Sequence, residues 1–222
     1  MAENICFQPL RFNAIKVKLL KNKHMKIGII GAGQIGQALA KKLIKAGYPV
    51  TLSNSRGIES LQPLVEELGT LAKAGTNEDA CNADVVILAV MWWHIPDILN
   101  KLKKQLKEKI VIDVSNNFTK DGDSPKLEKP TGVIVAELIP DTKIVKAFNH
   151  LFGKWIEADP IIDNGRRVSF ISGDYPSAKE IVGKIITELG FKVVDLGNLE
   201  QAGQITDIGK PLSGLNLVSY PN

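Results

Sequence analysis

Short, continuously apolar runs alternate along the chain with longer segments in which apolar residues recur every three or four positions. Apolar runs bounded by turn residues are typical of buried parallel strands, and the longer period is typical of helices packed on a sheet. We expect strands at 26–30, 49–53, 71–74, 84–90, 110–114 and 143–148, with helices at 34–46, 57–68, 76–82, 95–106 and 131–139. This alternation predicts an α/β fold with a doubly wound parallel sheet.

The turn after the first expected strand contains the glycine pattern GAGQIG, residues 31–36. In a strand–turn–helix context, Gly31 makes the tight turn, Gly33 lets the backbone approach a pyrophosphate, and Gly36 allows the helix to pack closely on the strand. Free N–H groups and the positive end of the helix dipole then receive the anion. The pattern alone is weak evidence, but its position between strand and helix predicts a dinucleotide-binding domain.

The end of the second expected strand indicates which dinucleotide is bound. It carries Ser53, Asn54, Ser55 and Arg56, where an NAD-specific site usually places an acidic residue on the adenosine ribose. Replacing a carboxylate by hydroxyl, amide and guanidinium groups removes repulsion for a 2'-phosphate and supplies charge-assisted donors. We interpret this as NADP(H) specificity; the alternative is an ordinary polar loop with a solvated arginine.

Two other strand ends carry candidate site residues, because ligands of open α/β sheets lie beyond the carboxyl ends of the strands. Trp92 and Trp93 follow the fourth expected strand, and Trp92 either flanks the dinucleotide or covers the sheet edge. Asn149 and His150 follow the sixth. His150 is the candidate for handling a proton or hydrogen-bonding the acceptor, because imidazole titrates near neutrality and the end of this strand faces the crevice; a histidine bonded to backbone or solvent is the alternative.

The composition, 44% hydrophobic and 23% charged, is ordinary for a soluble globular protein. The formal net charge of +4 resides in residues 1–24, so the remaining chain gives no argument for a nucleic-acid surface. No stretch is apolar and long enough to span a bilayer, and Cys6 and Cys81 form no disulfide framework or metal site. We expect a cytoplasmic protein. Residues 1–24 are expected to be a disordered leader, with a targeting arm or an upstream start as alternatives.

From Met25 on, the chain resembles the F420-dependent NADP oxidoreductase family and the related N-terminal domain of the metalloreductases. The resemblance rests on the segments MKIGIIGAGQIGQALA, LSNSRG, VVILAVMWW, VKAFNH, SGDYPSAK and LGFKVVDLGNLEQA, which extend over nearly the whole chain after residue 24. It implies hydride transfer between NADPH and a flavin-like or deazaflavin acceptor of the coenzyme F420 type, and a homodimer helped by the apolar residues Leu215, Leu217 and Val218.

The resemblance also implies which residues contact the two ligands. NADP contacts are expected at Gly33, Gln34 and Ile35 for the pyrophosphate, Ser53 to Arg56 for the 2'-phosphate, and Ala89, Val90 and Trp92 along the ribose and nicotinamide. The acceptor pocket is expected to be lined by Asn149, His150 and Lys210 to Leu212. Deazaflavin-using members tend to have histidine where this chain has Asn149, so the identity of the acceptor stays open.

We expect residues 25–150 to form a Rossmann-type NADP-binding domain and residues 151–222 a small α+β extension for substrate binding or dimerisation, with strands at 168–172 and 191–195 around a helix at 176–189. Such a reductase needs proximity and orientation rather than a catalytic triad. Two alternatives remain. An imine or carbonyl reductase generally adds a large helical domain, whereas about 70 residues follow the sixth strand here. A non-enzymatic NADP(H)-sensing module would bind the cofactor without turnover.

Overall fold

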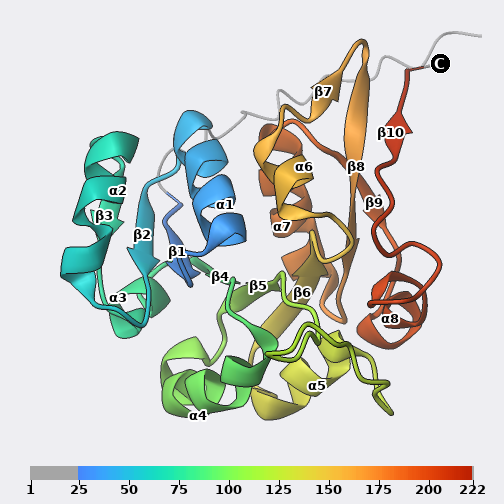
Figure 1. The fold of residues 1–222 in the computed structure, drawn as a ribbon, viewed down its shortest axis with the longest axis horizontal. Helices are drawn as coiled ribbons and strands as arrows, with labels where there is room; N and C mark the ends of the chain where they lie inside the picture. The colour runs from blue at the N-terminus through green and yellow to red at the C-terminus, as the bar shows by residue number, and fades with distance from the viewer. Residues whose placement is uncertain (1–24, 222) are drawn as a thin grey trace, which may run out of the picture.

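Six parallel strands joined by helices form the first part of the fold in the computed structural model, which describes residues 25–221 (Figure 1). The expected leader at 1–24 lies outside the described residues. The strands lie in the order β3-β2-β1-β4-β5-β6. Their bounds are β1 Ile27–Ile30, β2 Val50–Ser53, β3 Ala72–Ala74, β4 Val85–Leu88, β5 Ile110–Asp113 and β6 Lys143–Ala147. This order is that of a doubly wound dinucleotide-binding sheet, so the predicted fold class is confirmed.

The connecting helices follow the hydrophobic period closely. They are α1 Gln34–Lys45, α2 Gln62–Leu68, α3 Asn77–Cys81, α4 Ile95–Leu106 and α5 Thr131–Leu138. The prediction of a single helix at 57–68 is wrong for its first turn, where the structure has a separate 3-10 helix, η1 (Ile58–Leu61). The α-helix begins only at Gln62 because Pro63 lacks an N–H and fits within the first helical turn.

The sheet continues past residue 150 instead of ending there. β8 (Gly165–Ser172) pairs antiparallel with β6 and parallel with β9 (Lys192–Asp195), and α7 (Pro176–Glu188) connects β8 to β9. The chain then forms α8 (Leu199–Thr206). Three elements were not expected, because they are too short to show a period: α6 (Gly153–Glu157), β7 (Ile161–Ile162) and β10 (Val218–Ser219). Both expected domains therefore contribute strands to one sheet.

Helices cover both faces of this sheet and bury a hydrophobic core on each (Figure 1). One core joins α1 to α6 and α7, with Leu39, Ile156 and Val182 among its fully buried residues. The other lies beneath α3, α4, α5 and α8 and includes Leu99 and Leu199. Because the first core contains residues from before and after position 150, the C-terminal region packs as an integral part of the sandwich.

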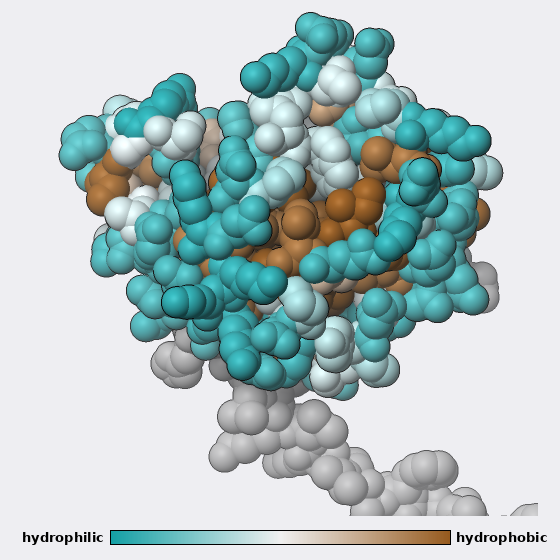
Figure 2. Space-filling model, turned by 90° about the horizontal axis from the view of Figure 1, so that it is seen from below, coloured by the Kyte–Doolittle hydropathy of each residue, from teal (hydrophilic) through white to brown (hydrophobic). Residues whose placement is uncertain are grey.

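The helix α5 is apolar on nearly every side, yet only part of it is enclosed. Its residues Val133, Ile134, Ala136 and Leu138 are half-buried. Figure 2 shows the side of the molecule on which α4 and α5 lie, and hydrophobic side chains gather in the middle of this face within a hydrophilic surround. A helix of this composition is usually covered on all sides. Residues 25–221 leave the outer face of α5 open.

Candidate functional site

The glycine turn between β1 and α1 is shaped by two close backbone approaches. Gly31 has φ +105°, and a Cβ placed on it would lie 2.2 Å from the carbonyl oxygen of Ala89 at the end of β4. A Cβ on Gly36 would lie 2.0 Å from the carbonyl oxygen of Gly31. Gly33 differs, because no atom lies within 4 Å of its added Cβ. Gly31 and Gly36 thus serve the fold, while Gly33 borders open space in front of the turn.

The start of α1 presents unpaired backbone donors to that open space. The first amide hydrogen bond of the helix runs from Gln37 N to Gly33 O, so the N–H groups of residues 34–36 have no partner within the helix. No acidic side chain lies in the first turn. The Ile35 side chain packs against the core, and the Gln34 side chain lies against Gly153 of α6. These two residues therefore offer a bound anion their backbone N–H groups and the helix dipole.

Of the four residues at the end of β2, the first is buried and stabilises the fold, and the other three lie at the surface of the cavity. Ser53 is fully buried, and its Oγ donates to Ile29 O at 3.2 Å, so its hydroxyl does not reach the cavity. Asn54 Oδ1 accepts the backbone N–H of Arg56 at 2.9 Å, which fixes a turn. The Ser55 and Arg56 side chains are exposed. Of the four residues expected around a 2'-phosphate, the structure brings Asn54, Ser55 and Arg56 to the cavity.

A cavity of about 700 Å³ joins the glycine turn, the end of β2 and the end of β4. Of the predicted residues, it brings together Gly31, Gly33, Asn54, Ser55, Arg56, Ala89 and Val90. Gly31 N donates to Ser53 O at 3.0 Å, which ties the glycine turn to the end of β2. The cavity has the place and the polar lining expected for the adenosine and pyrophosphate half of a dinucleotide.

Several residues that line this cavity were missed by sequence reasoning. They lie at the start of α3, in the segment between β4 and α4, and along one face of α4: Asn77, Glu78, Met91, His94, Asp97, Ile98, Lys101 and Leu102. The helical spacing of Ile98 and Lys101 puts them on one face, but which face meets the crevice depends on how α4 docks. Trp92 is not among the lining residues; it packs against the core beneath α4. This arrangement favours the alternative in which Trp92 covers the sheet.

An orphaned amide oxygen lies in the loop after β5, the strand that pairs with β4. Asn116 Nδ2 donates to Asn149 O at 2.7 Å, whereas its Oδ1 is buried and has no partner among the described residues. Phe148, just before Asn149, has φ +60°, an unusual backbone conformation for a bulky residue. Strained backbone and unpaired buried polar atoms are typical of ligand sites. Sequence reasoning noted that a strand ends here but did not choose Asn116.

The structure does not favour His150 as the residue that handles a proton or bonds the acceptor. The side chain is buried, its ring packs on Phe170 with centroids 4.6 Å apart, and Nε2 lies 3.3 Å from Val168 O. Burial lowers the pKa of His150 to about 4, although the bond to Val168 opposes this shift. The imidazole is therefore neutral at pH 7 and enclosed behind β8. A histidine bonded to backbone, the alternative left open by the sequence, describes it.

The other two expected parts of the acceptor pocket lie at α8. The buried side chain of Asn149 donates through Nδ2 to Thr206 O at 3.3 Å, which joins the end of β6 to α8. Lys210 to Leu212 form a turn after α8, with Lys210 N bonded to Asp207 O at 3.0 Å. The Asn149 side chain thus connects two elements of the fold and does not point into the crevice.

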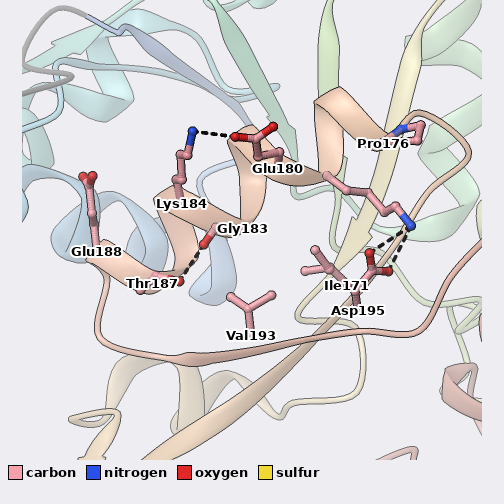
Figure 3. A pocket seen from close by; sticks show the side chains of 10 residues that line it. Ile171, Pro176, Glu180, Gly183, Lys184, Thr187, Glu188, Val193 and Asp195 are labelled. Atoms are coloured by element: carbon pink, nitrogen blue, oxygen red, sulfur yellow. Dashed lines mark hydrogen bonds and ion pairs between the residues drawn. The ribbon is translucent and has the colours of Figure 1, made fainter. Parts of the chain in front are cut away.

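A second hollow, of about 670 Å³, lies between α7 and β9, away from the glycine turn (Figure 3). Ile171 and Val193 form its apolar floor. Its two lysines are already paired with carboxylates, Lys184 with Glu180 at 2.8 Å and Lys179 with Asp195. Because both cations are neutralised within the chain, this hollow lacks the free donors that a dinucleotide phosphate requires.

Residues 25–221 contain no group of three His, Cys, Asp or Glu side chains placed to hold a metal ion. Within the same range, no helix is long and apolar enough to cross a membrane. Cys81 is buried, and burial raises the pKa of its thiol to about 11, so it is a poor nucleophile.

Known proteins with similar sequences are reductases by name. The family model described as NADP oxidoreductase coenzyme F420-dependent matches residues 26–117. Metalloreductase STEAP3 from Rattus norvegicus is 30% identical over 185 residues, covering 82% of this chain and 36% of STEAP3. The chain therefore spans little more than a third of that relative. The F420-dependent NADP reductase of Methanocaldococcus jannaschii is 29% identical over 210 residues, covering 87% of this chain and 93% of the reductase.

Solved structures agree with this assignment. The hypothetical protein SMa0349 from Sinorhizobium meliloti has a TM-score of 0.82 at 40% identity, covering 89% of this chain and 97% of that one. A putative F420 dependent NADP-reductase from Arthrobacter sp. FB24 shares the fold, with a TM-score of 0.69 at 23% identity, covering 79% and 86% of the two chains. The resemblance noted in the sequence is borne out: residues 26–117 match the F420-dependent NADP oxidoreductase family model, and an F420-dependent NADP reductase is similar over most of both chains.

Proposed function

We propose that this protein is an NADP(H)-dependent oxidoreductase that transfers a hydride between NADPH and a planar, flavin-like or deazaflavin acceptor. The cavity in front of Gly33 carries this proposal. It combines the unpaired N–H groups of α1 with the exposed guanidinium of Arg56, and the end of β2 carries no carboxylate. Unpaired N–H groups suit a pyrophosphate, and a guanidinium suits a 2'-phosphate, which only NADP(H) carries.

The nicotinamide end of the cofactor would lie at the ends of β4 and β5. Ala89 and Val90 border the cavity there, and the buried Oδ1 of Asn116 lacks a hydrogen-bond donor among the described residues. A nicotinamide carboxamide presents an N–H₂ donor that would satisfy this oxygen. We therefore assign Asn116 to nicotinamide binding, a role that accounts for its orphaned atom.

An aromatic pair beside α1 supports a planar acceptor. Phe152 is 55% exposed, and its ring lies 4.9 Å from that of Trp155 between centroids. The adjacent Gly153 touches the Gln34 side chain at the start of α1, so the pair lies next to the glycine turn. The loop at Gly214 approaches Phe152 from the C-terminal region. Exposed aromatic rings next to a nucleotide site suit stacking with a flat ring system.

Bound NADPH supplies the hydride, and the protein supplies the geometry. The N–H groups of α1 and Arg56 hold the phosphates, and Asn116 orients the nicotinamide so that one ring face meets the acceptor. Hydride transfer moves two electrons and one hydrogen nucleus to the acceptor. Because His150 is enclosed and neutral, we assign the accompanying proton to solvent water.

The test is oxidation of NADPH by the purified chain, followed by the loss of nicotinamide absorbance with one acceptor at a time. Coenzyme F420, flavin mononucleotide, ferric chelates and a cyclic imine represent the competing acceptor classes. Turnover with a planar ring acceptor supports the proposal. Turnover with the imine alone would replace it by imine reduction, and NADPH binding without any turnover would favour a sensing module.

We further propose that the protein acts in the cytoplasm as a homodimer. Leu215 and Leu217 are exposed near the C-terminal strand β10, which lies at one edge of the sheet. Exposed leucines gathered in one segment suit burial against a second copy. Light scattering on the purified chain decides between monomer and dimer. A Leu215→Lys/Leu217→Lys variant is expected to shift a dimer towards monomer.

A further inference from the structure

A buried ion pair joins the carboxyl ends of β5 and β6. Lys146 Nζ is 2.8 Å from Asp113 Oδ2, and the two side chains are only 4% and 0% exposed. The residues are direct partners in the parallel register of the two strands. Burying two charges is costly, and such pairs are often no more stabilising than apolar residues of similar size. Their bonds to Ser115, the neighbour of Asn116, suggest a different use.

The ion pair is hydrogen-bonded to both the backbone N–H and the backbone carbonyl of Ser115, in the loop that follows β5. Asp113 Oδ1 accepts the backbone N–H of Ser115 at 2.9 Å and its Oγ–H at 2.6 Å. Lys146 Nζ donates to the carbonyl oxygen of Ser115 at 2.7 Å. The backbone donor and acceptor of Ser115 are therefore both bonded to the same pair of charges.

The Ser115 carbonyl shares its planar peptide unit with the N–H of Asn116. Fixing that carbonyl therefore fixes the direction in which Asn116 leaves the strand. The Asn116 amide group is held further by its bond to Asn149 O at the end of β6. With Nδ2 engaged in this way, Oδ1 is left as the free acceptor. Lys146 thus fixes the backbone from which the Asn116 side chain leaves, and the bond to Asn149 O fixes the amide at its end.

We propose that Lys146, neutralised by Asp113, is a positioning residue that aims Asn116 Oδ1 at the nicotinamide. This inference rests on the proposed function, because it assigns Asn116 to the nicotinamide end of NADPH. Lys146 touches neither cofactor nor acceptor. Its ammonium acts through the Ser115 peptide, and its aliphatic stem passes under α5, where a Cβ on Gly132 would lie 3.6 Å from Lys146 Cδ.

The test measures binding of the adenosine half of the cofactor separately from binding of the whole cofactor. Adenosine 2',5'-bisphosphate occupies only the adenosine half, whereas NADPH also needs the nicotinamide end. In the double variant Lys146→Met/Asp113→Asn, both charges disappear together, so that no buried charge is left alone. The new amide can still accept from Ser115 N. We expect adenosine 2',5'-bisphosphate to bind as in the wild type and NADPH to bind about tenfold more weakly, the loss of about one hydrogen bond.

A matched control and a rescue variant complete the design. The double variant Lys179→Met/Asp195→Asn removes an ion pair of similar length between α7 and β9, away from the cavity, and is expected to leave both affinities unchanged. Lys146→Gln/Asp113→Asn restores an N–H donor near the Ser115 carbonyl and is expected to recover part of the NADPH affinity. If the methionine variant does not fold, the glutamine variant tests the role of Lys146 instead, through the ratio of NADPH affinity to adenosine 2',5'-bisphosphate affinity.

Two results would overturn the inference, in distinguishable ways. If the methionine and glutamine variants keep the wild-type ratio of NADPH to adenosine 2',5'-bisphosphate affinity, Lys146 is only a structural residue. If the wild type itself binds the two ligands equally, Asn116 does not bind the nicotinamide. Failure of the wild type to bind adenosine 2',5'-bisphosphate would instead refute the proposed NADP(H) site.

Discussion

Replacing Arg56 by alanine should convert the protein from one that prefers NADPH to one that distinguishes the two cofactors poorly. The guanidinium is exposed at the edge of the cavity. Two unit charges about 4 Å apart interact by about 1 kcal/mol in bulk water and about 4 kcal/mol near a protein surface. Because Arg56 is well solvated, we take about 1 to 2 kcal/mol, which weakens NADPH binding about 5- to 30-fold.

Calorimetric titration of NADPH and NADH against the wild type and Arg56→Ala measures this effect. NADH lacks the 2'-phosphate, so its affinity should not change. Arg166→Ala is the matched control, because Arg166 is an exposed arginine on β8 that does not line the cavity. The loss for NADPH should shrink as salt is added, since exposed charges are screened. Equal losses for NADPH and NADH, or no loss for either, would refute the assignment of Arg56 to the 2'-phosphate.

Three further predictions concern the glycine turn, the histidine and the orphaned amide. Gly31→Ala should lower the free energy of unfolding by several kcal/mol, since its Cβ would meet the Ala89 carbonyl, whereas Gly33→Ala should keep thermal stability and lose NADPH affinity; thermal melts and titrations compare the two. His150 has a folded pKa of about 4 and an ordinary value of 6.5. Between these values the unfolded chain binds a proton that the folded chain does not, so the free energy of unfolding should fall by about 2 kcal/mol from pH 7 to pH 5. Urea denaturation checks this fall, and a His150→Gln variant with the same pH slope would contradict the assigned pKa. Asn116→Leu should weaken NADPH binding and slow turnover while leaving adenosine 2',5'-bisphosphate binding unchanged; equal losses for both ligands would contradict its assignment to the nicotinamide.

The elements of the N-terminal sheet could be predicted from the sequence because each one satisfies its own local rule. The run at 85–90 is continuously apolar, as a strand covered on both faces must be. The helix expected at 76–82 begins with a reciprocal capping box between Thr76 and Asp79, with bonds of 3.1 and 3.0 Å. The glycine turn is equally local. Where two or five residues form an element, as in β10 and α6, too few positions exist for a period to show.

The candidate site could be predicted only in part, because several of its properties depend on contacts between distant segments. His150 follows a strand whose carboxyl end meets the crevice, but β8 pairs with that strand and encloses the imidazole. Ser53 has the right residue type for a phosphate, yet its side chain points into the core. Asn116 stands out only when its neighbours are known, since a lone asparagine after a strand is common in turns.

Comparison of NADPH and NADH binding to the purified chain by calorimetry decides whether the cavity in front of Gly33 binds NADP(H). We expect NADPH to bind at least about tenfold more tightly than NADH, with adenosine 2',5'-bisphosphate competing for the same site. Preference for NADH, or failure of adenosine 2',5'-bisphosphate to compete, would contradict the assignment of Asn54, Ser55 and Arg56 to the 2'-phosphate.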